Sequence, residues 1–221
     1  LEHLTARNMA MYTEQRRFTE NAAHELRTPI ALLQGKLERL FQSKDLTQEQ
    51  ATLLEEAGNV LGRMHRSHEG LLLLARLENG AAPRIGISDP NAIVSNVLTQ
   101  WDDRIRELHL TLVVDGVANA TWRMEPAMAE ILLGNLVSNA IRHNRAGGRI
   151  TIGISPTACT VSNTGDAAPL DPTQLFKRFA GSGKGLGLGL AIAQRVCERQ
   201  GWSLTYAYEA PLHVFRVALP N

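Results

Sequence analysis

A histidine at position 24 stands among residues that could make it a nucleophile. An imidazole nitrogen accepts a phosphoryl group only when the ring is neutral and held in place. The adjacent Glu25 offers a carboxylate that can hold the other ring nitrogen or take its proton. Thr28 follows four residues later, on the same helical face as His24. Its hydroxyl could orient a water that removes the phosphoryl group from the histidine again. These three residues form a candidate catalytic group.

Pro29 directly follows this group. It cannot donate a hydrogen bond to the carbonyl of Glu25, so it bends the helix just past the histidine. A loosened turn suits a histidine that has to meet two partners. Taken alone, His24 could equally be a surface histidine beside a salt-bridge partner. The histidines without such neighbours are interpreted as solvated or packing residues: His65, His68, His109 and His213.

Two asparagines, Asn135 and Asn139, lie one helical turn apart in a second candidate site. Amide oxygens are neutral ligands, and Mg²⁺ that carries a triphosphate needs only one or two protein oxygens in addition to water. Arg142, three residues after Asn139, could reach the phosphates. Either asparagine alone could be a polar residue of a half-buried helix, but the pair predicts a magnesium nucleotide site.

A glycine-rich segment precedes the last helical pattern, with glycines at positions 185, 187 and 189. Glycines let backbone N–H groups approach phosphate oxygens, and a helix N-terminus adds favourable partial charge. Lys184 could supply a point charge to the same phosphates. The segment does not match Gly-x-x-x-x-Gly-Lys-Ser/Thr, so we do not expect a P-loop.

A helical hairpin must carry the histidine. From residue 1 to about 42 the chain is rich in helix formers, and Thr47 is a plausible N-cap for a second helix to about Glu78. Apolar residues recur at mostly heptad spacing along both helices: Ile30, Leu33, Leu37, Leu40, Leu53, Ala57, Val60, Met64, Leu71 and Leu74. One hairpin leaves part of these seams in water, so we expect a homodimeric four-helix bundle.

A second domain must carry the asparagines and glycines. Asn79, Gly80 and Pro83 end the helical pattern, so residues 1–79 are expected to form the first domain, 80–89 a linker and 90–221 the second domain. Its periodicity predicts an α/β sandwich with helices on one face of a mixed sheet. Helices are expected at 90–108, 126–143 and 186–200, and strands at 110–114, 149–154, 158–162, 203–208 and 214–219.

The composition is that of a globular protein without a strong charge bias. Of the 221 residues 44% are hydrophobic and 20% charged, and the net charge of +1 implies no nucleic-acid partner. The two cysteines, Cys159 and Cys197, are too few for a disulfide framework and are expected in the core. No run of about 18 apolar residues occurs, so we expect any membrane anchor or sensor to lie upstream of Leu1.

Five segments together resemble the sensor histidine kinases of bacterial two-component systems. His-Glu-Leu-Arg-Thr-Pro at residues 24–29 resembles their H-box, and the helix with Asn135 and Asn139 resembles their N-box. A first glycine box at 161–166, an F-box at 175–179 and a second glycine box at 185–189 follow in the family's order. The resemblance spans nearly the whole chain, and this order is its strongest support.

The resemblance assigns further residues to ATP. It implies that Asn139 is the main Mg²⁺ ligand with Asn135 assisting, and that His143 flanks the nucleotide where the family usually has Tyr. Asn163 replaces the Asp that accepts a hydrogen bond from the adenine amino group, and an amide oxygen can also accept one. The other residues implied to bind the nucleotide are Gly165, Phe176 as an anchor of the lid, Lys184, and the run Gly185, Leu186, Gly187, Leu188 and Gly189.

The family resemblance implies a fold and an activity. The fold would be a dimeric four-helix bundle followed by an ATP-binding sandwich of the gyrase, Hsp90 and histidine kinase type. The chain would use MgATP to phosphorylate His24 and pass the phosphoryl group to an aspartate of a response regulator receiver domain, with Thr28 supporting phosphatase activity. It would be the cytoplasmic portion of a bacterial inner-membrane sensor, without a nucleic-acid partner.

Two alternatives stay open at this point. The chain could be a degenerate kinase that dimerises and docks a regulator but turns over little ATP, because Asn163 and the thin first glycine box depart from the family pattern. It could also be an ATPase of the gyrase and Hsp90 type. That class lacks the helix of His24 and usually carries a catalytic carboxylate on the N-box helix, whereas Glu130 lies about one turn too early.

Overall fold

The computed structural model divides the chain into two compact units, residues 1–79 and 80–221. It describes residues 29–43, 46–79, 86–118, 120–166, 168–179 and 187–220. Among these residues, none of the helices combines the length and apolar character that a bilayer span requires.

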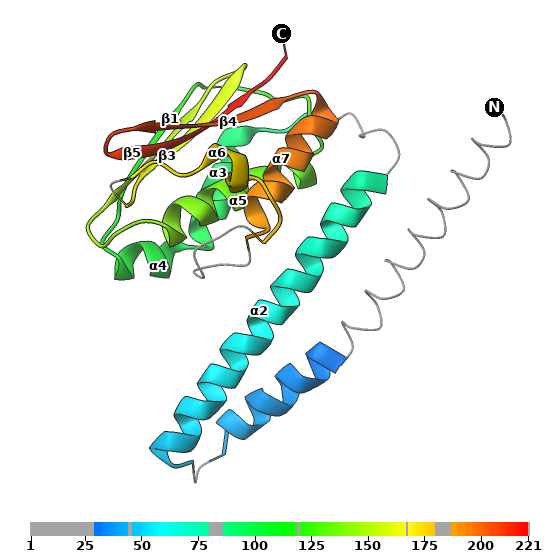
Figure 1. Ribbon diagram of the computed structural model, residues 1–221, viewed down its shortest axis with the longest axis vertical. Coiled ribbons are helices and arrows are strands. Elements are labelled where there is room, and N and C mark those ends of the chain that lie inside the picture. Colours follow the sequence, from blue (N-terminus) through cyan, green and yellow to red (C-terminus); the bar gives the residue numbers. More distant parts are fainter. Residues whose placement is uncertain are drawn as a thin grey trace, which may run out of the picture. The chain divides into compact units, whose positions relative to one another are not determined.

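Within residues 29–43 and 46–79, the described part of the first unit, one helix covers residues 29–41 and another, α2, covers Gln48–Asn79 (Figure 1). The N-terminus of α2 is closed by a capping box, in which the Thr47 N–H donates to Gln50 Oε1 over 3.0 Å and the Gln50 N–H donates to Thr47 Oγ1 over 3.2 Å. The predicted N-cap at Thr47 is therefore confirmed.

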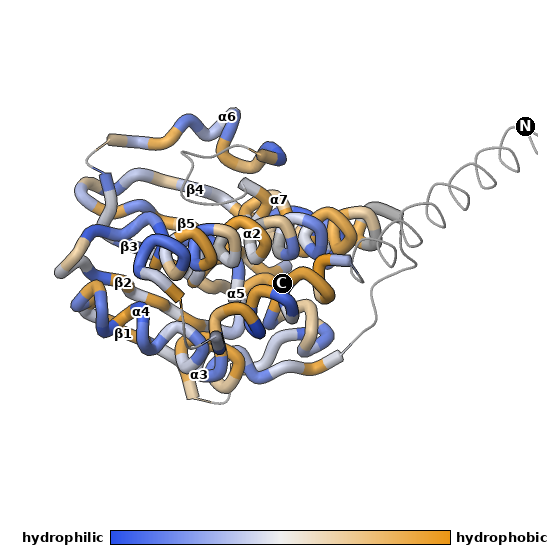
Figure 2. Tube along the Cα trace, turned by 90° about the horizontal axis from the view of Figure 1, so that it is seen from below, coloured by the Kyte–Doolittle hydropathy of each residue, from blue (hydrophilic) through white to orange (hydrophobic). Residues whose placement is uncertain are grey.

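The second unit is a five-stranded mixed sheet with α3, α5 and α7 on one face (Figure 1). The strand order is β1-β2-β3-β5-β4, in which only β1 and β2 are parallel. Figure 2 shows the strands in this order, with α6 on the β4 side. The predicted α/β sandwich is confirmed. Its elements are α3 (Pro90–Thr99), α4 (Asp102–Glu107), β1 (Thr111–Gly116), α5 (Pro126–Arg142), β2 (Arg149–Ile154), β3 (Ala158–Thr164), α6 (Pro172–Leu175), α7 (Gly189–Gln200), β4 (Ser203–Glu209) and β5 (Leu212–Ala218).

The core lies between the sheet and its helices. Alternate residues of β2, Ile150, Ile152 and Ile154, are buried against the helical layer, as period-two patterning requires. Both cysteines lie in this core, as predicted. Burial raises the pKa of the Cys159 thiol and of the Cys197 thiol to about 12, so both stay protonated at neutral pH.

The predicted single helix over residues 90–108 was wrong, because the structure breaks it into α3 and α4. At the break the Trp101 N–H bonds to the Leu98 carbonyl, three residues back, and Trp101 takes φ −111° and ψ 7°. Its ring faces α5, where the guanidinium carbon of Arg142 lies 5.3 Å from the ring centroid. The break thus coincides with a contact to another helix, and the helix propensity of residues 90–108 contains no information about such a contact.

Several boundaries also differ from the predicted ones. α7 begins at Gly189, three residues later than expected, after Gly187 with its φ of 63°. β3 runs two residues further than expected and β5 starts two residues earlier, because Asn163 pairs with His213 and Thr164 with Leu212. Residues 86–89, within the expected linker, join the second unit through two backbone hydrogen bonds between Ser88 and Trp122.

Candidate functional site

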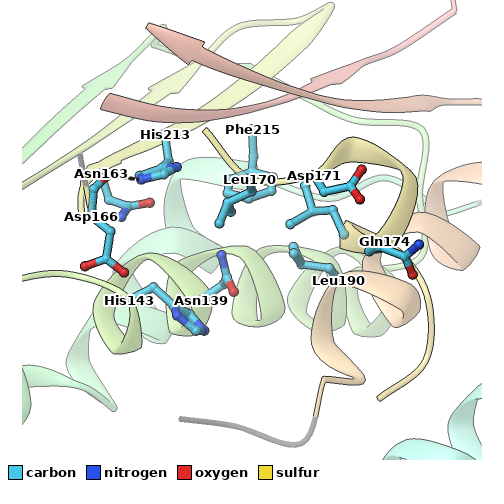
Figure 3. A pocket seen from close by; sticks show the side chains of 11 residues that line it. Asn139, His143, Asn163, Asp166, Leu170, Asp171, Gln174, Leu190, His213 and Phe215 are labelled. Carbon is cyan, nitrogen blue, oxygen red and sulfur yellow. Dashed lines mark hydrogen bonds between the residues drawn. The ribbon is translucent and has the colours of Figure 1, made fainter. Parts of the chain in front are cut away.

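A cavity of about 250 Å³ lies between α5, β5 and the segment that leads into α6 (Figure 3). Asn163, Asp166 and His143 lie at one end of it, and Leu170 and Leu190 lie at the other end together with the polar Asp171 and Gln174 (Figure 3). Eleven residues line it: Asn139, His143, Asn163, Asp166, Leu170, Asp171, Gln174, Leu175, Leu190, His213 and Phe215. A small concave site with a few convergent polar groups is typical of ligand binding.

Helix α5 supplies one wall, with Asn139 and His143 one turn apart (Figure 3). The helix begins at Pro126, where a missing N–H costs nothing, and buries one face against the core. This burial fixes the rotation of the helix and leaves both residues half-buried on the cavity side. The structure therefore brings these two predicted nucleotide-binding residues together.

Strand β3 supplies a buried hydrogen-bond acceptor. The side chain of Asn163 is 1% exposed, and its Nδ2 donates to the Thr164 carbonyl over 2.8 Å. This bond orients the amide, and the buried Oδ1 has no hydrogen-bond partner among the described residues. An unpaired buried acceptor costs about 1–3 kcal/mol, so Oδ1 is suited to a ligand that brings a donor.

Gly165 follows Asn163 at a point of close approach between three elements. A Cβ at this position would lie 2.8 Å from His213 Cδ2 and 3.0 Å from the carbonyl oxygen of His143. A larger residue would therefore push the chain away from α5 and β5. The packing thus requires a small residue at Gly165, and its contact with a nucleotide stays a prediction.

Asn135 lies beside the start of α7 and is not among the residues that line the cavity. Its Nδ2 donates to the Ile131 carbonyl over 2.7 Å, one turn back on α5. Its Oδ1 lies 3.0 Å from where a Cβ of Gly189 would stand. Leu190, the next residue of α7, does line the cavity, so the amide oxygen of Asn135 borders the same helix N-terminus.

At the N-terminus of α7, no side-chain cap from the described residues reaches the backbone N–H groups. Leu188 is its buried N-cap residue and provides no side-chain cap. The Phe179 N–H donates to the Gly187 carbonyl over 2.9 Å, which joins the two ends of the segment 180–186. Lys184, Gly185 and Leu186 lie outside the described residues.

Phe176 and Arg142 are also not among the residues that line the cavity. Phe176 is the half-buried C-cap residue of α6, and its neighbours Gln174 and Leu175 line the cavity instead. Arg142 places its guanidinium over Trp101. Contact of either residue with a nucleotide stays a prediction. The catalytic candidates His24, Glu25 and Thr28 lie outside the described residues.

Sequence reasoning missed His213, which was interpreted as a solvated or packing histidine. The structure buries it to 5% exposure in the cavity wall, where it bonds to Tyr206 and to the carbonyl of Asp166. Alternation along β5 puts residues 213, 215 and 217 on the helical face, which a longer predicted strand would have indicated. The predicted strand began one residue too late to include it.

A hydrogen-bonded cluster ties the C-terminal side of α5 to β3. Thr164 Oγ1 donates to Asn144 Oδ1 over 2.7 Å and accepts from the Arg149 N–H over 2.8 Å. These bonds hold the turn that follows His143 against the end of β3. His143 and Asn163 are thereby kept on opposite sides of one cavity.

Replacement of Thr164 by valine is expected to lower the free energy of unfolding by about 2 kcal/mol, because two hydrogen bonds are lost without a change in shape. Urea unfolding of the chain measures this loss. Thr160→Val on the same strand is the control, since no side-chain hydrogen bond of Thr160 occurs among the described residues. Equal losses for both variants would contradict the role of the cluster.

Comparison with known proteins places both units in defined families. The family model described as "His Kinase A (phospho-acceptor) domain" matches residues 14–80. The model described as "Histidine kinase-, DNA gyrase B-, and HSP90-like ATPase" matches residues 125–220. The sensor histidine kinase HprS of Escherichia coli K12 is 31% identical over 92% of this chain and 47% of its own length. The chain thus spans about half the length of this curated relative.

Two solved structures share the fold. A full-length ShkA in complex with AMPPNP has a TM-score of 0.69 at 20% identity and covers 92% of this chain and 46% of its own. The Acinetobacter baumannii histidine kinase AdeS has a TM-score of 0.63 at 24% identity, over 90% of this chain and 98% of its own. With a phospho-acceptor domain followed by an ATPase-type domain in one polypeptide, the chain belongs to the sensor histidine kinases.

Proposed function

We propose that this chain binds MgATP in the cavity of its second unit and phosphorylates its own His24. The observation that carries the proposal is the buried Oδ1 of Asn163, which has no hydrogen-bond partner among the described residues, in a cavity of about 250 Å³. His24 lies within the matched phospho-acceptor domain, and the cavity lies within the matched ATPase domain. The two groups that the reaction needs therefore occur in one chain.

The cavity lining fits an adenine base. Asn163 Oδ1 accepts a hydrogen bond from the 6-amino group, which satisfies the buried oxygen. Leu170, Leu190 and Phe215 supply apolar walls for the faces of the ring (Figure 3). His143 flanks the base from α5. ShkA, which shares the fold, is described in complex with the ATP analogue AMPPNP.

The phosphate groups are assigned to the start of α7 and to the segment before it. The backbone N–H groups of Gly189 and Leu190 have no side-chain cap among the described residues, so they can donate hydrogen bonds to phosphate oxygens. Gly187 and Leu188 adjoin this end, and Gly185, Leu186 and Lys184 precede it in the sequence. Phe176 is assigned to anchor the segment that covers the nucleotide.

The amide oxygens of Asn139 and Asn135 fit a hard cation. Asn139 faces the cavity and the Oδ1 of Asn135 borders the start of α7, so both lie next to the expected phosphates. Bound Mg²⁺ supplies neutralisation of the charge that develops on the transferred phosphoryl group. Arg142 is assigned to the same phosphates.

The first unit supplies the nucleophile. Glu25 holds or deprotonates the imidazole of His24, whose free nitrogen attacks the γ-phosphorus of ATP. The N–P bond forms as the bond between the γ-phosphorus and the β,γ-bridging oxygen breaks, and ADP leaves. The phosphohistidine then transfers its phosphoryl group to an aspartate of a response regulator receiver domain. Thr28 orients a water for the phosphatase reaction. ATP and such regulators are cytoplasmic, so we infer a cytoplasmic setting for both units.

A homodimer would cover the apolar seams of the first unit. Leu53 and Met64 of α2 are 58% and 55% exposed, and Val60 between them is also exposed. Leu33 and Leu40 are exposed on the first helix. Rows of exposed large apolar side chains at heptad spacing are typical of helices that pack against a second copy.

Incubation with ATP labelled at the γ-phosphate tests the proposal. The wild type is expected to acquire an acid-labile label, and His24→Gln is expected to acquire none, because glutamine keeps polarity but cannot attack phosphorus. His109→Gln, which changes an exposed histidine of the second unit, is the matched control. Label that persists in His24→Gln would contradict the proposal. A wild type that binds no MgATP in calorimetry would also contradict it.

A further inference from the structure

A tyrosine and a histidine on neighbouring strands hold the connection between β3 and α6. His213 of β5 pairs in register with Asn163 of β3 and lines the cavity. Its Nδ1 lies 2.9 Å from the hydroxyl of Tyr206 on β4. Its Nε2 lies 2.9 Å from the carbonyl oxygen of Asp166 (Figure 3). The Leu170 N–H donates to the same hydroxyl over 3.0 Å.

The partners fix where the protons lie. A carbonyl oxygen only accepts, so Nε2 of His213 carries the proton that it donates to Asp166. In the neutral ring Nδ1 is then an acceptor, and the Tyr206 hydroxyl donates to it. The hydroxyl oxygen is left to accept from the Leu170 N–H. Every donor in this chain of hydrogen bonds has one acceptor.

The chain of hydrogen bonds ends at two residues that line the cavity but are exposed to solvent. Asp166 and Leu170 both line the cavity, yet both are exposed. They flank a connection that also supplies Asp171 to the lining. Exposed backbone of this kind is ordered by its hydrogen bonds more than by packing. The position of this cavity wall therefore depends on two side chains of the sheet.

We propose that Tyr206 and His213 are positioning residues, which preorganise the cavity wall formed by Asp166 and Leu170 for the nucleotide. The proposal rests on the nucleotide binding proposed above. A ligand that must first order a loop loses part of its affinity to that ordering. The hydrogen bonds of Tyr206 and His213 order the wall beforehand, and His213 stands beside Asn163 in the same wall.

Tyr206→Phe is the decisive variant. It removes the hydroxyl and with it the bonds to His213 and Leu170, but keeps the ring that contacts Phe215 at a centroid distance of 5.2 Å. The dissociation constant for MgATP, measured by calorimetry on the whole chain, is expected to rise about 10-fold. Amide hydrogen exchange at Leu170, measured without nucleotide, is expected to become faster.

Tyr208→Phe is the matched control. Tyr208 lies on the same strand and its ring centroid lies 5.2 Å from that of His213, but its hydroxyl makes no hydrogen bond within the described part of the chain. Its affinity for MgATP and its exchange at Leu170 should match the wild type. Equal effects of both variants would overturn the proposal, because a general weakening of β4 would then explain them.

His213→Gln separates the two halves of the network. Glutamine can still donate to the Asp166 carbonyl but offers no ring nitrogen to Tyr206, so an intermediate rise in the dissociation constant is expected. This variant decides the matter if Tyr206→Phe fails to fold. Wild-type affinity in both variants, with unchanged exchange at Leu170, would overturn the proposal. A wild type that binds no MgATP would instead refute the proposed function, while the exchange of Leu170 would still report on the network.

Discussion

Replacement of Asn139 by alanine is expected to reduce the rate of autophosphorylation roughly 100-fold, equivalent to about 2.7 kcal/mol of transition-state stabilisation. Asn139 is half-buried on α5 and lines the cavity, where its amide oxygen is the proposed ligand for Mg²⁺. Alanine removes the oxygen and keeps the helix, because it has the highest helix propensity of any residue. The loss should therefore appear in activity and leave the fold intact.

The measurement is the initial rate of label transfer from ATP at several Mg²⁺ concentrations. Asn139→Ala should need more Mg²⁺ than the wild type to reach half of its own maximal rate. Ser138→Ala is the control on the same helix, since Ser138 Oγ donates only to the Asn135 carbonyl of its own helix and does not line the cavity. An unchanged rate for Asn139→Ala would remove this residue from the proposed metal site.

Replacement of Asn163 by leucine is expected to weaken ATP binding by about 10–100-fold. The variant loses the buried acceptor for the 6-amino group, and a donor left unpaired in a buried site costs about 1–3 kcal/mol. The Thr164 carbonyl also loses its donor, which lies 2.8 Å away in the wild type. Leucine has a similar size, so the change is chemical more than steric.

Base selectivity gives the sharper readout for Asn163. Inosine triphosphate has a 6-oxo group, which would face the oriented Oδ1 acceptor to acceptor, so the wild type should prefer ATP by at least about 10-fold. Asn163→Leu should lose this preference. Ser162→Ala, on the opposite face of β3, should keep it. Equal binding of both nucleotides by the wild type would contradict the assigned orientation of the amide.

Asn163→Asp is an informative companion, because this exchange restores the acid that the family usually carries. A carboxylate keeps an acceptor for the 6-amino group but cannot donate to the Thr164 carbonyl. The nucleotide-free chain should therefore unfold at a lower temperature than the wild type, while the preference for ATP persists. The asparagine thus combines an acceptor for the ligand with a donor for its own backbone.

Much of the fold could be predicted because it depends on local patterns. The strand over residues 149–154 alternates apolar and polar residues, and the observed β2 has the predicted bounds. Thr47 is the predicted cap because a hydroxyl residue before a helical run satisfies a free N–H group. The predicted element boundaries were wrong where a tertiary contact competed with local helix propensity. This is the case at Trp101, whose ring contacts Arg142 of α5.

The sequence by itself predicted the two-domain plan, the family and the candidate pair Asn135 and Asn139, since residue types at fixed spacing are visible in one dimension, and the family resemblance added Asn163. Only the tertiary structure decided that the buried Asn163 Oδ1 has no hydrogen-bond partner in the part of the chain that is described, and that His213 belongs to the same cavity wall. The orientation of an amide depends on the Thr164 carbonyl beside it. The role of His213 depends on Tyr206 and Asp166, and spacing along the chain does not predict which side chains a sheet register brings together.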